Sequence, residues 1–157
     1  MKRYIFHSLE SGPKAVARLL RVFPKDRLDE RLETNRFTAR EVLAHLADIE
    51  EVHLGRMRKA IQEPGYKMVP INVDERVVEH HYNEKDPYHE GEVFESRRIM
   101  TLDFLRDLTD EQLHTKCFDP KGEEIDVLSY AASMIAHDMY HLEQLTAYLA
   151  NEAAVLH

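Results

Sequence analysis

Apolar side chains recur at helical spacing in four stretches of the chain. The first stretch runs roughly from Ser8 to Val22, where Leu9, Val16 and Leu20 share one face. Pro24 ends this predicted helix, because proline has no N–H to donate and its ring clashes with the preceding turn. The pattern therefore predicts a first amphipathic helix with one buried side.

The second helix has a clear start signal. Thr38 and Glu41 form a capping box, in which each side chain can accept a hydrogen bond from the other residue's backbone N–H. The dipeptide Pro64-Gly65 stops the helix. Its inward stripe consists of Val42, Leu46, Ile49, His53, Met57 and Ala60, so His53 is expected to lie in or near the core.

The third and fourth helices complete the set. The third is predicted from about Glu90 to Asp107, and the fourth from an N-cap at Asp126 to about Ala150. The apolar arc of the fourth helix spans more than about 100°, which indicates burial on two sides and favours a homodimer.

The connections between these helices differ in length. The segment from Tyr66 to Glu90 has no regular pattern beyond a candidate short helix from Val73 to Tyr82, and connections this long are often functional. A second capping box at Thr109 predicts one short turn, and a turn signal after Cys117 predicts a small hairpin. We therefore predict an all-α, antiparallel four-helix bundle with a long irregular connection between helices two and three, in a single domain over residues 1–157.

Composition removes several classes of function. The chain has 157 residues, a formal net charge of -8 and a pI near 5.7, so no basic field is available for nucleic acid or anionic membranes. No apolar run approaches the roughly 20 residues of a membrane span. The single cysteine, Cys117, excludes an internal disulfide and, with no visible secretory signal, favours a cytoplasmic location.

Histidines supply the candidate chemistry. His137 and His141 are four residues apart, so their imidazoles lie on one helical face and could reach the same metal ion. His45 lies on the inward side of the second helix, and antiparallel packing could bring it to that pair. Asp48 and Asp138 follow such histidines closely and are candidate catalytic residues, either orienting an imidazole or accepting a proton.

Two of these motifs resemble a known family. The segments Thr38–Glu50 and Ala136–Leu145 are similar to the second-helix and last-helix motifs of the DinB-like (YfiT-like) superfamily, the latter with its His-Asp-x-x-His-x-x-Gln pattern. The resemblance extends in the same order over most of the chain. It implies a four-helix bundle, often dimeric, in which His45, His137 and His141 hold one divalent ion such as zinc, nickel or iron.

The resemblance also suggests an activity. Family members include transferases and isomerases that use bacillithiol, mycothiol or glutathione, and suspected hydrolases. We therefore expect a metal-dependent enzyme that activates water or a low-molecular-weight thiol towards a small electrophilic substrate, with the Tyr66–Glu90 connection lining the open face of the site. The arginines Arg56, Arg58, Arg97 and Arg98 are scattered in sequence and form no obvious basic cluster for an acidic thiol.

Two alternatives stay open. A di-iron carboxylate protein would use Glu50 with His53 and Asp138 with His141, together with lone carboxylates at Glu10 and Glu95. The other alternative is a non-catalytic bundle with a structural metal.

Overall fold

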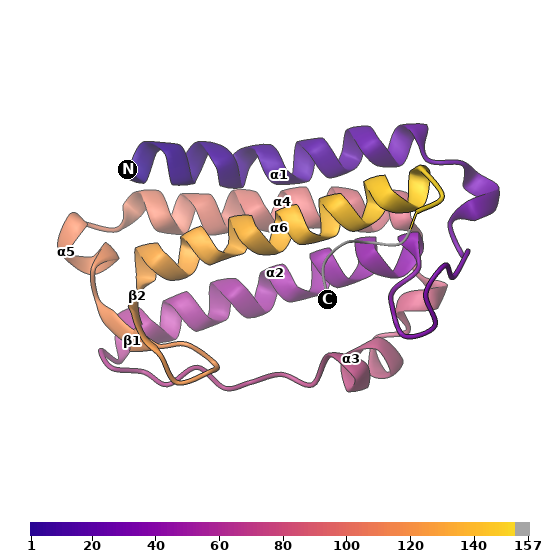
Figure 1. The fold of residues 1–157 in the computed structure, drawn as a ribbon. Coiled ribbons are helices and arrows are strands. Elements are labelled where there is room, and N and C mark those ends of the chain that lie inside the picture. Colours follow the sequence, from indigo (N-terminus) through magenta and orange to yellow (C-terminus); the bar gives the residue numbers. More distant parts are fainter. Residues whose placement is uncertain (153–157) are drawn as a thin grey trace.

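Four long helices form a bundle in the computed structural model, which describes residues 1–152 (Figure 1). They are α1 (Lys2–Val22), α2 (Ala39–Gln62), α4 (Pro87–Asp107) and α6 (Val127–Leu149). The predicted all-α four-helix bundle is therefore confirmed. The last five residues of the predicted single domain lie outside the described part of the chain.

Short elements fill the connections between the long helices. These are α3 (Val73–Glu79), α5 (Asp110–Leu113), two 3₁₀ turns, η1 (Lys25–Arg27) and η2 (Tyr82–Glu84), and two paired antiparallel strands, β1 (Lys116–Phe118) and β2 (Glu124–Asp126). The predicted short helix, capped turn and hairpin are all present. None of the helices described is long and apolar enough to cross a membrane.

The long connection between α2 and α4 sets the relative direction of these two helices. Helix α2 packs against α4 and α6, and α1 packs against the same two helices. Residues 63–86 return along the whole bundle, so that α2 and α4 run parallel, whereas α2 and α6 run antiparallel (Figure 1). The connection is fastened to α2 on the way, through Arg56 Nη2 to Val69 O (2.6 Å) and Arg76 to Asp48 (2.7 Å).

Two helices begin earlier than their patterns predicted. Helix α1 starts at Lys2 rather than Ser8, because Phe6 extends the buried stripe of Leu9 by one more turn. Helix α4 starts at Pro87 rather than Glu90. Proline suits the first turn of a helix, where no N–H partner is needed, and Asp86 caps the helix by accepting from the Tyr88 N–H.

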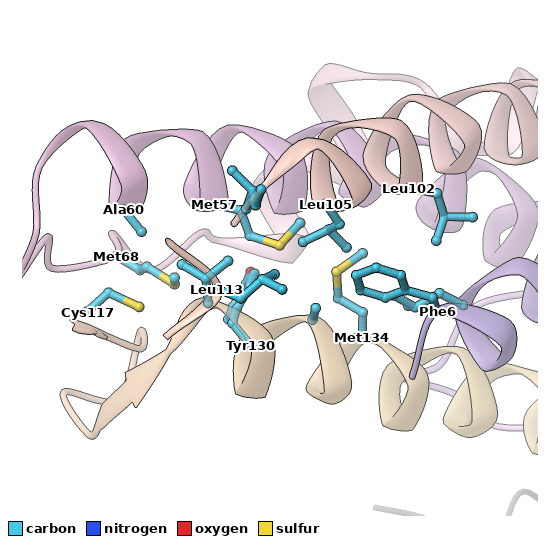
Figure 2. Packing of buried hydrophobic residues seen from close by; sticks show 14 residues of the cluster. Phe6, Met57, Ala60, Met68, Leu102, Leu105, Leu113, Cys117, Tyr130 and Met134 are labelled. Carbon is cyan, nitrogen blue, oxygen red and sulfur yellow. The ribbon is translucent and has the colours of Figure 1, made fainter. Parts of the chain in front are cut away.

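The core divides into two apolar clusters along the bundle. One cluster lies at the end of the bundle that carries the β1–β2 hairpin. It contains residues of all four long helices, among them Phe6, Met57, Leu105 and Met134 (Figure 2). The other lies towards the opposite end and includes Leu20.

A close contact at Gly12 gives the first stability prediction. A Cβ at Gly12 would clash with Asp138 Oδ2, which Arg98 holds in place, so Gly12→Ala is expected to lower the free energy of unfolding by about 1–3 kcal/mol. Gly55→Ala is the matched control, since a Cβ at Gly55 would have nothing within 4 Å of it; this substitution should stabilise α2 by up to about 1 kcal/mol. Urea denaturation would measure both changes, and equal effects would contradict the predicted contact.

Candidate metal centre

Three imidazoles from two helices converge inside the bundle. His45 comes from α2, and His137 and His141 come from α6. The Nε2 atom of His137 lies 3.1 Å from that of His45 and 3.2 Å from that of His141. Two nitrogens that are each about 2.0–2.1 Å from a tetrahedral metal would be roughly 3.3 Å apart, so the observed spacing fits one ion.

The protonation of this cluster suits a cation. Burial lowers the pKa of His45 to about 3 and that of His137 to about 4, and it lowers the pKa of His141 well below its ordinary value. The three rings are therefore neutral at physiological pH. Neutral nitrogens this close repel one another through their lone pairs unless a proton or a cation lies between them, and metal ligation needs the same neutral form.

A chain of hydrogen bonds sets the tautomer of His141. The Tyr148 hydroxyl donates to the Phe37 carbonyl and accepts from Gln144 Nε2. This orientation of the amide leaves Gln144 Oε1 facing His141 Nδ1 at 3.0 Å. Because Oε1 can only accept, Nδ1 carries the hydrogen, and the Nε2 lone pair is free to bind a metal.

The other two rings are held differently. Phe37 packs over His45, with ring centroids 5.0 Å apart. The Nδ1 atom of His45 is buried and has no hydrogen-bond partner among the described residues, which is unusual for a metal ligand. Packing against Phe37 therefore orients this ring more than hydrogen bonding does.

A small cavity opens beside His141. Its volume is about 200 Å³, and its lining includes Phe37, Val73, Asp74 and Tyr140. Val73 and Asp74 belong to the long connection between α2 and α4. The connection thus contributes one wall of a space that reaches a candidate metal ligand.

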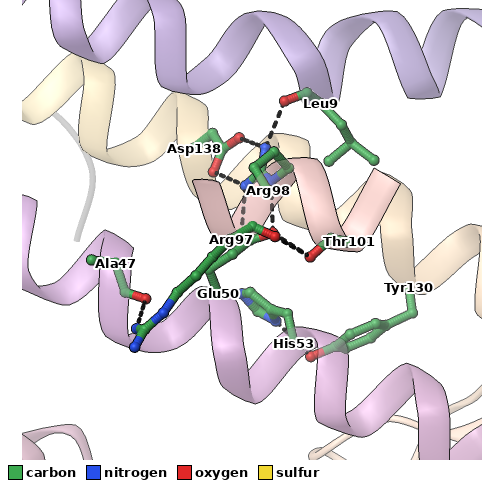
Figure 3. Close-up of polar contacts among 9 residues, drawn as sticks. All are labelled: Leu9, Ala47, Glu50, His53, Arg97, Arg98, Thr101, Tyr130 and Asp138. Atoms are coloured by element: carbon green, nitrogen blue, oxygen red, sulfur yellow. Dashed lines mark hydrogen bonds and ion pairs between the residues drawn. The ribbon is translucent and has the colours of Figure 1, made fainter. Parts of the chain in front are cut away.

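The Asp138 carboxylate belongs to a buried ion-pair network (Figure 3). The Arg98 guanidinium donates to both oxygens of Asp138, at 2.7 and 3.0 Å, and to both oxygens of Glu50, at 2.8 Å. Its remaining bond goes to the Leu9 carbonyl, at 2.8 Å. That carbonyl lacks its usual helix partner because Pro13, four residues later, has no N–H. This geometry favours a structural role for Asp138.

Asp48 is also engaged by other residues. Arg76 donates to both of its oxygens, at 2.7 Å, and the Tyr82 hydroxyl donates to Oδ2. Partial burial opposes ionisation, but these bonds outweigh it and lower the pKa of Asp48. Tyr82 in turn packs near His45, with ring centroids 6.3 Å apart. The catalytic role suggested for either aspartate stays a prediction.

Comparisons with known proteins agree with this architecture. The family model of the DinB superfamily matches residues 8–145. The chain belongs to the DinB superfamily. A search of solved structures finds a protein described as "YfiT from Bacillus subtilis is a probable metal-dependent hydrolase with an unusual four-helix bundle topology", at 20% identity and a TM-score of 0.86, covering 97% of this chain and 89% of that one. A search of curated proteins found no match.

This DinB-superfamily chain has a further polar residue beside the cluster. His53, which sequence analysis placed in or near the core, is buried and packs edge-on against His137, with ring centroids 5.6 Å apart. Eight residues separate it from His45, which places it about two turns along α2 and about 80° around the helix. That spacing was the available signal, but only the antiparallel packing of α6 reveals the contact.

Proposed function

We propose that this protein is a metal-dependent enzyme that holds one divalent ion on His45, His137 and His141 and acts on a small electrophilic substrate. The observation that carries the proposal is the convergence of three neutral Nε2 atoms, 3.1–3.2 Å from one to the next, beside a cavity. Three imidazoles leave coordination positions open, which is typical of catalytic rather than structural sites. Zinc, nickel and iron all accept such ligands.

The bound ion would lower the pKa of water or a thiol and polarise the substrate. The protein's own contribution is to hold the ligands. Gln144 keeps the His141 hydrogen on Nδ1, and the rings of Phe37 and Tyr82 pack around His45 and limit its exposure to water. Arg98, which binds Asp138 and Glu50 behind the cluster, keeps the adjoining turn of α6 in register with α1 and α2.

A metal ion on these three histidines could activate either water for hydrolysis or a thiol for transfer. The relative from Bacillus subtilis is described as a probable metal-dependent hydrolase, which supports water as the nucleophile. A cavity of about 200 Å³ suits a small substrate. A low-molecular-weight thiol as co-substrate, a homodimer and a cytoplasmic location stay predictions from the sequence, as do the expectations of no nucleic-acid and no membrane partner.

The geometry favours this site over a di-iron centre. Glu50 and Asp138 both bind Arg98, and Glu10 bonds to Lys14 at the surface. In the described part of the chain, the three histidines are the only group of three or more His, Cys, Asp or Glu side chains whose ligand atoms all lie within 4.8 Å of one another. A non-catalytic metal site would use the same histidines and is separated from the proposal by activity alone.

The deciding experiment is metal-dependent turnover. Protein stripped with a chelator and reloaded with zinc, nickel or iron(II) would be assayed on a panel of esters, lactones and amides, and on electrophiles with added thiol. We expect turnover only after reloading, and its loss in His137→Ala, with His7→Ala as a matched surface control. Stoichiometric metal without turnover on any substrate would instead favour the non-catalytic bundle.

A further inference from the structure

A short hydrogen-bond relay ends at the inner wall of the metal centre. The Tyr130 hydroxyl on α6 lies 2.7 Å from His53 Nδ1 on α2, and Arg56 Nη1 donates to the same hydroxyl at 3.1 Å. Figure 3 shows His53 and Tyr130 reaching towards each other from their two helices. Arg56 is itself fixed by its bond to the Val69 carbonyl.

The direction of these bonds follows from the groups involved. A guanidinium has donors only, so the Tyr130 oxygen accepts from Arg56. Among the described residues the phenol hydrogen has no acceptor other than Nδ1 of His53, so we infer that Tyr130 donates it to Nδ1. The hydrogen of the neutral imidazole therefore resides on Nε2.

That Nε2–H group has nothing to bond to within the described residues. A buried donor without an acceptor costs stability, so such a group calls for a physical explanation, such as a bound water, an ion or a ligand. His53 contributes no atom to the three-nitrogen cluster, yet its ring lies against His137. The unused donor therefore lies against a candidate metal ligand, whereas the cavity beside His141 is lined by other residues.

We propose that His53 Nε2–H donates a hydrogen bond to an oxygen atom of the substrate bound beside His137, with Tyr130 and Arg56 as positioning residues. The inference rests on the proposed function and narrows its substrate class to compounds with an acceptor oxygen, such as esters, lactones or amides. A fixed donor at this position stabilises negative charge that develops on a carbonyl oxygen. Electrophiles without such an oxygen gain nothing from His53.

The first test needs no metal. In the metal-free protein, ¹⁵N NMR of the imidazoles should show His53 with its hydrogen on Nε2, and Tyr130→Phe should give a mixture of tautomers. A hydrogen on Nδ1 in the wild-type protein would overturn the inference, because the free donor would not exist.

The second test uses cobalt(II) and acetate as probes. Cobalt affinity is measured first from the visible spectrum, followed by acetate affinity of the cobalt-loaded protein. His53→Phe should leave the cobalt affinity within about twofold and weaken acetate binding by about five- to tenfold, the size of one hydrogen bond.

The outcomes separate the two proposals. Unchanged acetate affinity in His53→Phe, with cobalt bound, would overturn the role of His53 and leave the metal centre standing. Failure of the wild-type protein to bind cobalt would overturn the metal centre and, with it, the role of His53 in substrate binding.

Discussion

Replacing Arg98 with methionine is expected to lower the free energy of unfolding by about 3–5 kcal/mol. The Arg98 side chain is 2% exposed and pairs with Glu50 and Asp138, which are 1% and 8% exposed. Burial alone would lower the pKa of Arg98, but its bonds to Asp138 and Glu50 raise it, so the group stays charged. Methionine would leave two buried carboxylates without a counter-charge.

Chemical denaturation monitored by circular dichroism would measure this loss. Arg106→Met is the matched control on the same helix, because Arg106 is 48% exposed and its ion pairs are weak; we expect a change within about 0.5 kcal/mol. Adding Glu50→Gln and Asp138→Asn to Arg98→Met should recover part of the loss. Equal effects of the two single substitutions would show that the buried network contributes little.

The contacts of Arg98 depend on the packing of helices that are far apart in the sequence, and local patterns do not predict them. The helices and their caps follow local rules, so the Thr38 box and the Asp126 cap are readable from neighbouring residues. By contrast, Gly12-Pro13 in the middle of α1 looks unfavourable when read alone. Only the folded arrangement explains it, because Gly12 makes room for Asp138 and Pro13 frees the Leu9 carbonyl for Arg98.

In the candidate site, too, some features follow from local spacing and others only from tertiary contacts. His137 and His141 are related by helical spacing alone, and the inward position of His45 could be anticipated from its stripe. Whether a nearby polar residue faces the cluster depends on its side-chain partners. Asp48 and Asp138 bind arginines, whereas His53, which looked like a core residue, packs against His137.

Removal of one candidate ligand is expected to have the largest effect on metal binding. His141→Ala should weaken zinc binding about a hundredfold to a thousandfold, since the apparent binding energy of protein zinc sites is of order 10–16 kcal/mol shared among three or four ligands. Competition against a chromophoric chelator would measure the affinity. Elemental analysis of untagged protein should find about one ion per wild-type chain.

Two further variants distinguish metal binding at the buried cluster from adventitious binding at the surface. Gln144→Met removes the acceptor that keeps the His141 hydrogen on Nδ1, and should weaken binding about ten- to a hundredfold. His7→Ala, an exposed histidine on α1, should change nothing. Adventitious binding to surface histidines would respond to His7 as much as to His141 and would ignore Gln144. An ion on the Nε2 side of the buried cluster predicts this order, with the ligand most sensitive, the tautomer-setting residue next and the surface histidine last, in variants that circular dichroism shows to be folded.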